Sequence, residues 1–293
     1  MATSVSQAFT TFKTNLEITE PQEQATSTRQ QNVRAAVARR LSVVDAFLTG
    51  SYRRHTLIAP LKEADIDVFV VLDSKHYHEV NARSDAQAAL LDRVRSVLRE
   101  TYPNTPDISR NGQAVTIRFT DFLVDVVPAF NRDGGGYLIP NSISKTWIST
   151  DPKVHVSLVS QSNQTHNGNL VPQIKMIKAW NKAIDHRFHS FHLEVLALAI
   201  YHNVTISDYP SGARWFFDKG RALIKKKNPD PAGYSDDVGA YIDTTEKIND
   251  AAGKFETAFE RALRAEAAAR NGNVREALST WRLVFGDYFP TYG

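Results

Sequence analysis

Two aspartates one residue apart lead directly into an apolar run, and this arrangement constrains the fold more than any other feature of the chain. Asp65, Ile66 and Asp67 are followed by VFVVL, a run too apolar for an exposed edge strand. Side chains of a strand alternate between its two faces, so Asp65 and Asp67 project together while Ile66 points the other way. We therefore expect a buried strand over 67–72 with two carboxylates at its start.

A third carboxylate lies in another strand-like run. Asp125 stands between Val124 and Val126 in the segment FLVDVVPAF. Carboxylates on adjacent strands are costly to hold together in an apolar sheet unless cations neutralise them. Hard divalent ions such as Mg²⁺ take oxygen ligands and often combine one or two carboxylates with substrate phosphates. The set Asp65, Asp67 and Asp125 therefore indicates a two-metal phosphoryl- or nucleotidyl-transfer site, with Mg²⁺, or Mn²⁺ in its place, as the cofactor.

A Gly-Ser step precedes the aspartate pair. Gly50 and Ser51 follow an apolar pattern that predicts a helix from about 23 to 49, and Gly50 stands where a helix end favours positive φ. A flexible turn there can bring backbone amides and a hydroxyl to a phosphate. A lone Asp-x-Asp is most often a cap or a solvated strand end. The turn, the apolar run and Asp125 together favour metal chemistry.

Composition excludes several classes of protein. The formal net charge of +3, from 35 cationic and 32 acidic side chains, is too small to indicate a nucleic-acid binder. The absence of cysteine excludes disulfides, thiolate metal sites and a Cys nucleophile. The N-terminus has no apolar signal core, and no apolar run is long enough to cross a bilayer. We therefore expect a cytoplasmic protein that does not contact a membrane.

The remaining periodicity predicts a mixed first half and a helical second half. An opening helix is expected around Phe9 and Phe12, a helix over 85–101, and a hairpin of 113–119 with 122–127. The later helices are expected over 170–182, 191–201, 246–271 and 274–286. Together with the aspartate site, this predicts a nucleotidyl-transfer core with N-terminal helices over 1–165 and a closely packed helical lobe over 166–293.

Several motifs together resemble a known family. Gly50-Ser51, Asp65-Ile66-Asp67 and Asp125 follow the pattern of the DNA polymerase β-like nucleotidyltransferases. The detailed resemblance is to the bacterial cyclic oligonucleotide synthases related to cyclic GMP-AMP synthase (the DncV-like CD-NTases). It is carried by GSYRRHT, VDVVPAF, WISTDP, LVPQIKMIKAWN, SFHLE and the terminal FGDYFP, which span from about residue 40 to the end. The fold it implies is α+β: a polymerase β-like mixed sheet flanked by helices, with a helical C-terminal lobe.

The resemblance also implies roles for individual residues. Asp65, Asp67 and Asp125 would be the catalytic metal ligands, and Gly50 and Ser51 would bind the β- and γ-phosphates. In the helical lobe, Lys178 and Ser190 would contact the triphosphate. Lys178 is preferred to Lys175 because the family pattern has the lysine directly before Ala-Trp. One alternative for Lys178 stays open, namely that it is a solvated helix lysine. Ser190 is also a candidate N-cap of the next helix, a role compatible with the phosphate contact.

Together with the aspartate site, the resemblance implies an enzyme that joins nucleoside triphosphates into a cyclic di- or trinucleotide second messenger and releases pyrophosphate. By resemblance it would act in antiphage (CBASS) signalling, with room for a regulatory protein partner. One alternative is an RNA-terminal or small-molecule nucleotidyltransferase on the same fold. Another is a catalytically inactive nucleic-acid or protein sensor, which the three aspartates disfavour. Base choice is left open, with Ser160, Gln161 and Asn163 as candidate pocket residues.

Overall fold

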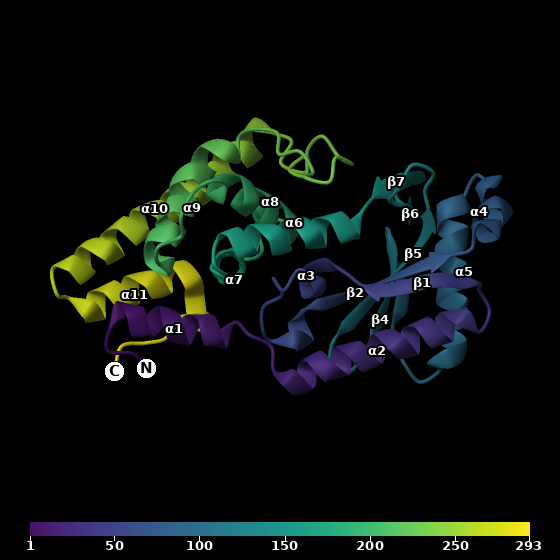
Figure 1. Cartoon of the computed structure of the whole chain (residues 1–293), viewed down its shortest axis with the longest axis horizontal. Coiled ribbons are helices and arrows are strands. Elements are labelled where there is room, and N and C mark those ends of the chain that lie inside the picture. Colours follow the sequence, from purple (N-terminus) through teal and green to yellow (C-terminus); the bar gives the residue numbers. More distant parts are fainter. The chain divides into compact units, whose positions relative to one another are not determined.

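The computed structural model describes residues 1–293, and its contacts divide the chain into two units (Figure 1). The sheet unit is Ile18–Val156, and the helical unit is Met1–Glu17 together with Ser157–Gly293. This division differs from the expected boundary at residue 165, and it assigns the opening helix to the helical unit. The aromatic side chains of that helix pack against the C-terminal segment, a long-range contact that no local pattern reports.

The sheet unit is built on a mixed seven-stranded sheet. The strands β1 (Val43–Leu48), β2 (Asp65–Leu72), β5 (Leu123–Asn131), β4 (Ala114–Arg118) and β3 (Ile108–Asn111) lie in that order, and β6 (Tyr137–Asn141) pairs with β5 and with β7 (Thr146–Thr150). The pair β2–β5 is parallel and the other pairs are antiparallel. The expected hairpin is confirmed as β4–β5, because Val115 pairs with Val126 across a short turn.

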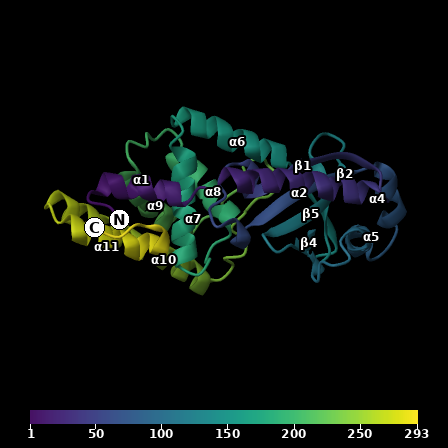
Figure 2. The same ribbon diagram turned by 90° about the horizontal axis from the view of Figure 1, so that it is seen from below.

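Two long helices cover one face of the sheet. α2 (Glu20–Ala38) packs on β1 and β2, and α5 (Ala86–Thr101) packs on β3, β4 and β5 and on α2 itself. Figure 2 shows α2 running along β1 and β2. The short helices α3 (Gly50–Arg53), η1 (Leu61–Glu63) and α4 (Ser74–Asn81) connect the strands.

The expected helix from 23 to 49 is wrong in its second half. α2 ends at Ala38, and the residues that follow form strand β1. Apolar residues in this stretch recur at helical spacing, but strand pairing decides the conformation: Phe47 pairs with Phe69 and Leu48 with Val68 of the buried strand β2. Gly50 therefore follows a strand and does not end a helix.

Alternation along β2 divides the core between the two faces of the sheet. Ile66, Val68 and Val70 belong to the large cluster that includes apolar residues of α2 and α5. Phe69 and Val71 belong to a smaller cluster on the other face, together with residues of β5 and β6. The face opposite the two long helices is therefore the face on which the odd-numbered residues of β2 lie.

The helical unit confirms the helices expected in the second half of the chain. Its elements are α1 (Val5–Asn15), α6 (Pro152–Thr165, which begins in the sheet unit), α7 (Leu170–Ala183), α8 (Ser190–Tyr201), α9 (Tyr209–Leu223), α10 (Thr245–Arg270), α11 (Val274–Phe285) and η2 (Gly286–Tyr288). Phe9 and Phe12 of α1 pack against Phe285 and Phe289 in edge-to-face and tilted arrangements, at ring-centroid distances of 4.7–6.0 Å. None of the helices combines the length and the apolar character needed to cross a bilayer.

Candidate active site

The three predicted carboxylates lie on one face of two neighbouring strands. Asp67 of β2 is in register with Asp125 of β5, and Asp65 is two residues away on the same face of β2. Adjacent strands lie about 4.8 Å apart, so Asp67 and Asp125 are direct cross-strand neighbours. Because Phe69 and Val127 continue this face, it is the one opposite α2 and α5. Parallel pairing of β2 with β5 brings together residues that are distant in sequence.

A threonine extends this row to a third strand. Thr116 of β4 pairs with Asp125, and its Oγ1 donates a hydrogen bond to Asp125 Oδ1 at 2.5 Å. Burial raises the pKa of Asp125, the Thr116 hydrogen bond lowers it, and the charge of Asp65 raises it, with a net increase. Burial also raises the pKa of Asp65, against a smaller lowering by Arg118. The fold therefore holds these two carboxylates in surroundings that disfavour their ionised forms.

Gly50 lies against the carboxylate of Asp67. A Cβ at position 50 would come within 1.7 Å of Asp67 Oδ2, and the φ of Gly50 is +63°, in the region that favours glycine. The backbone N–H of Thr49 donates to the carbonyl of Asp67 at 3.0 Å, which fixes the end of β1 beside the aspartate. The close approach of Asp67 thus requires glycine here, and the backbone conformation favours it. The turn and the aspartate pair, separate in sequence, form one local structure.

Ser51 follows Gly50 at the start of the short helix α3. Its carbonyl accepts the backbone N–H groups of Thr56 and Leu57 at 2.9 and 3.1 Å, which closes the turn after the helix. The side chain is partly exposed. The structure thus places Ser51 next to the residue that contacts Asp67, on the same turn that the sequence indicated.

The donor set fits a hard divalent cation by chemistry and by register. The side chains are all carboxylates, and two of them are cross-strand neighbours on one sheet face. Burial raises the pKa of Asp65 and Asp125, which means that it disfavours their ionised forms. A bound cation would offset the free-energy cost of ionising them. In the conformation of this structure, no group of three His, Asp or Glu side chains is close enough together to hold a metal ion. The fit therefore rests on donor type and strand register.

Lys178 of the helical unit is buried in an ion pair and is not an exposed helix lysine. Its Nζ lies 2.6 Å from Oε1 of Glu194 on α8, and the two side chains are 6% and 1% exposed. Lys175, one turn earlier on α7, is also buried but pairs with Glu17, which follows α1. The two lysines, between which only the family pattern made a choice, thus have different partners.

Ser190 is the first residue of α8 and is exposed. The N-cap position belongs to His189, so the alternative interpretation of Ser190 as the N-cap is wrong. Tyr241 holds this helix start: its ring stacks on His189 with centroids 3.8 Å apart, and its hydroxyl accepts the His189 backbone N–H at 3.0 Å. The loop after α9 therefore supports the end of α8 that carries Ser190.

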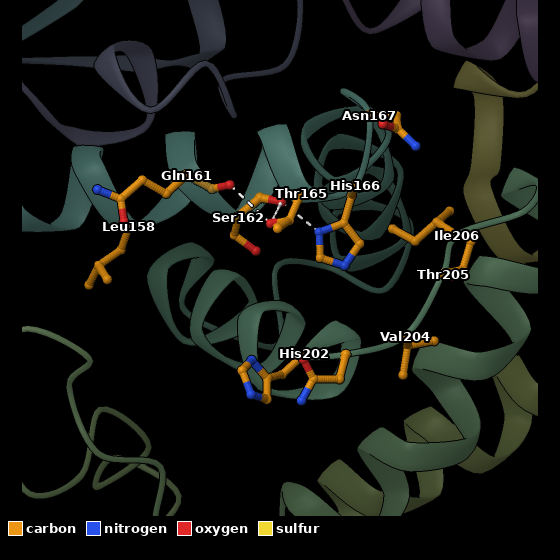
Figure 3. A pocket seen from close by; sticks show the side chains of 11 residues that line it. Leu158, Gln161, Ser162, Thr165, His166, Asn167, His202, Val204, Thr205 and Ile206 are labelled. Carbon is orange, nitrogen blue, oxygen red and sulfur yellow. Dashed lines mark hydrogen bonds between the residues drawn. The ribbon is translucent and has the colours of Figure 1, made fainter.

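A cavity of about 730 Å³ opens elsewhere in the helical unit, between α6 and the segment after α8. Figure 3 shows His166 among its lining residues; Nδ1 of this histidine lies 2.5 Å from the Ser162 carbonyl and Nε2 lies 3.0 Å from that of Tyr201. Of the candidates for base choice, Gln161 lines this cavity, and Asn163 accepts a hydrogen bond from Val171 N at 2.9 Å. Ser160 is exposed.

Three residues that contact or influence the predicted site residues were not predicted from the sequence. Thr116 bonds Asp125, Arg118 lowers the pKa of Asp65, and Glu194 pairs with Lys178. Strand alternation from the assigned hairpin would have placed Thr116 on the same face as Asp125. Glu194 is the last residue of the SFHLE motif, but no local pattern indicated its contact with Lys178, because the packing of α7 on α8 is tertiary.

Comparison with known proteins identifies the family. Residues 3–163 match the model of the Second Messenger Oligonucleotide or Dinucleotide Synthetase domain, which is more than half of the chain. The chain belongs to this synthetase family. The expected family and enzyme class are therefore confirmed: it is an enzyme of the group that makes oligonucleotide or dinucleotide second messengers.

Two curated relatives agree with this assignment. The chain is 28% identical over 275 residues to a probable cyclic nucleotide synthase of Bacillus cereus, covering 83% of this chain and 81% of that protein. It is also 28% identical over 268 residues to the cyclic AMP-AMP-AMP synthase of an Acinetobacter species, covering 84% and 73%. The similarity extends over both units of the synthetase.

The fold also matches that of a solved relative. The structure of Escherichia coli MS115-1 CdnC in a complex with HORMA-deltaN has a TM-score of 0.79 at 18% identity, covering 97% of this chain and 98% of that one. A second structure of CdnC, with ATP, has a TM-score of 0.78 at 17% identity over the same shares. The expected α+β fold with its mixed sheet is confirmed.

Proposed function

We propose that the chain joins nucleoside triphosphates into a cyclic di- or trinucleotide and releases pyrophosphate. The observation that carries this proposal is the row formed by Asp67, Asp125 and Thr116, with Asp65 beside it, on the sheet face opposite the long helices. Membership of a synthetase family supplies the reaction class. Two similar proteins are named for cyclic nucleotide products, which supports a closed product here as well.

The aspartates would hold the reacting groups at the sheet. Asp65 and Asp67 would bind the cation that accompanies the triphosphate, and Asp125 with them would complete the second cation position. Mg²⁺ there would neutralise charge on the phosphates and lower the pKa of the attacking hydroxyl. Nucleotidyl transfer depends mainly on positioning and electrostatics, so no side chain has to form a covalent intermediate. The carboxylates act in the ionised form.

The remaining residues of the proposed site would bind phosphate. Gly50 allows the backbone to approach Asp67, and the turn that it begins would present Ser51 to the β- and γ-phosphates. In the helical unit, Lys178 and Ser190 would contact the triphosphate, as the family resemblance implies. Lysine suits this role as a compact charge with three N–H donors.

We further propose a cytoplasmic role in antiphage signalling. The basis is the family resemblance. CdnC, which has the same fold, has been solved with a HORMA partner, and this supports a regulatory protein partner for the present chain as well. The substrates would be nucleoside triphosphates, and ATP is the first to test because CdnC has been solved with it.

A rival is an RNA-terminal or small-molecule nucleotidyltransferase on the same fold. The similar proteins named for cyclic products disfavour this rival. The decisive assay is incubation with all four labelled triphosphates and Mg²⁺ or Mn²⁺, followed by nuclease digestion and mass spectrometry. A cyclic product of two or three nucleotides made without an acceptor supports the proposal, and products formed only on added RNA or a small acceptor support the rival.

The double variant Asp65→Asn/Asp67→Asn tests the metal site in the same assay. We expect it to abolish product formation, because two of the three ligand carboxylates lose their charge. The metal-free variant should melt at a higher temperature than the metal-free wild type at neutral pH, since burial disfavours the charge of Asp65. Full activity of this variant would exclude the proposed cation site.

A further inference from the structure

A buried ion pair links the two helices that carry the proposed triphosphate contacts of the helical unit. Lys178 is on α7 and Glu194 on α8, with Nζ and Oε1 2.6 Å apart and both side chains almost fully buried. Removing one partner of such a pair leaves an uncompensated buried charge, so the position of each side chain depends on the other. The place of the Lys178 ammonium is therefore set by α8.

Glu194 lies one helical turn from Ser190 on the same side of α8. Residues four apart in a helix share a face and are separated by a rise of about 6 Å. The N-cap residue His189 makes no side-chain hydrogen bond to the first turn. The first-turn N–H groups, which have no partner within a helix, favour an anion at this end. Glu194, the partner of the Lys178 ammonium, thus lies about one turn from the residue that begins α8.

We propose that Glu194 is a positioning residue for the triphosphate, which holds the Lys178 ammonium where it can donate to a phosphate oxygen. This inference rests on the proposed function, in which Lys178 and Ser190 contact the triphosphate. A lysine side chain has high rotamer freedom, and fixing it before the nucleotide arrives removes part of the cost of binding. An ammonium has three N–H donors, so one lysine can bond a carboxylate and a phosphate together.

A second pair on the same helix provides a matched control. Lys175 is one turn before Lys178 on α7, its side chain is 7% exposed, and it pairs with Glu17. Glu17 follows α1 and is not on α8. Glu17→Gln therefore also removes a carboxylate from a buried lysine of α7, but it leaves the start of α8 unchanged. The Glu17 side chain is 46% exposed and that of Glu194 is 1% exposed, so the control matches the lysine and not the burial of the carboxylate. A purely structural role for the Lys178–Glu194 pair predicts that Glu194→Gln lowers Tm without weakening nucleotide binding.

The experiment compares Glu194→Gln, Glu194→Asp, Glu17→Gln and Lys178→Met in the full chain. KM and kcat are measured with ATP and Mg²⁺, binding is measured by calorimetry with a non-hydrolysable ATP analogue, and Tm is recorded. We expect Glu194→Gln to raise KM and the analogue Kd about tenfold, the usual effect of losing a hydrogen bond to a charged group. Glu194→Asp should recover part of the loss, and Glu17→Gln should leave both constants within about twofold.

The double variant Lys178→Met/Glu194→Gln should bind the analogue no more weakly than Lys178→Met alone, because Glu194 acts through the lysine. Equal constants for Glu194→Gln and wild type, or additive losses in the double variant, overturn the proposal. If Glu194→Gln does not fold, Glu194→Asp, which keeps the charge but shortens the side chain, must bind the analogue more weakly than wild type and more tightly than Lys178→Met. A wild type that makes no product refutes the proposed function, whereas the binding series still decides the role of Glu194.

Discussion

The backbone of Gly50 lies directly against Asp67, one of the proposed cation ligands. Its positive φ can be adopted by other residues at moderate cost, but the space where a Cβ would stand is occupied by the Asp67 carboxylate. A side chain there must displace either the turn or the aspartate. Gly134, in the exposed loop after β5, also has positive φ, at +85°, yet nothing lies within 4 Å of its Cβ position.

This pair of glycines separates backbone strain from displacement of the aspartate. Both Gly50→Ala and Gly134→Ala should lose about 1 kcal/mol from the left-handed backbone, by urea unfolding. Gly50→Ala should also reduce kcat/KM at least tenfold, because Asp67 has to move; misplacement of about 1 Å has effects of this size or greater. Turnover by Gly50→Ala at the rate of Gly134→Ala would show that Asp67 is not a ligand.

Thr116 tunes the carboxylate that it bonds. Its hydroxyl lowers the pKa of Asp125, against the larger effect of burial. Thr116→Val keeps the side-chain shape but removes the donor, so the pKa of Asp125 should rise further. Since the proposed reaction needs the ionised carboxylate, the acid limb of the pH profile of kcat/KM should move to higher pH. An unmoved acid limb would separate Asp125 from the titration that controls activity.

At the scale of elements, α8 is held by a buried histidine as well as by its ion pair. His192 is 1% exposed, its Nδ1 lies 3.1 Å from the Tyr241 hydroxyl, and its Nε2 has no hydrogen-bond partner. Burial lowers its pKa from 6.5 to about 4, with an opposing effect of Asp237 and a further lowering by His189. The neutral ring is therefore part of the packing between α8 and the loop that contains Tyr241.

The depressed pKa of His192 predicts an acid-sensitive contribution to stability. The unfolded chain takes up this proton below pH 6.5, whereas the folded chain does so only near pH 4, so the contribution is present above pH 6.5 and is lost as the pH falls to 4. The loss amounts to about 3 kcal/mol, from 1.36 kcal/mol per pKa unit. His192→Asn should remove this part of the pH dependence in urea unfolding, and the exposed His202→Asn should retain it.

The opposite sign is expected for the carboxylates of the sheet. Burial raises the pKa of Asp65 and Asp125, so the folded state binds more protons than the unfolded state and stability falls as the pH rises through the carboxyl range. The histidine and carboxylate effects therefore partly cancel in wild type at acid pH. The comparison of His192→Asn with wild type isolates the histidine, because the carboxylates contribute equally to both.

At the scale of the whole molecule, the charge distribution bears on the kind of product. The net charge is +3, and the one run of three lysines, 225–227, is exposed in the loop after α9. Tight binding of long nucleic acids requires several phosphate contacts and is strongly weakened by salt. A short product that closes on itself needs no such surface.

We therefore expect phosphatase-resistant products of two or three nucleotides, formed without a primer. Between about 50 and 200 mM salt, the rate should fall far less than the thousandfold or more expected for a protein that tracks six to ten backbone phosphates. Product analysis with and without phosphatase, over this salt range, checks both points. Long linear oligomers with steep salt dependence would favour a polymer-extending transferase.

The local sequence pattern was sufficient to predict an element wherever the conformation of a segment depends on its own residues. The acidic pair at the head of an apolar run predicted β2 and the common side of Asp65 and Asp67, because alternation is a property of a single strand. The β4–β5 hairpin and the amphipathic helices of the second half also followed from short-range periodicity and turn signals. The candidate aspartates and Gly50 therefore followed from the residue pattern alone, as did the family resemblance.

Tertiary structure decided the features that depend on contacts between distant segments. Residues 43–48 have apolar spacing compatible with a helix, but they form β1 because pairing with β2 satisfies their backbone and buries their side chains together. Parallel pairing of β2 with β5 places Asp67 beside Asp125, and the packing of α7 on α8 gives Lys178 its partner Glu194. Periodicity indicates which face of a segment is apolar. Which other segment covers that face depends on the free energy of the whole chain, and a local pattern does not contain that information.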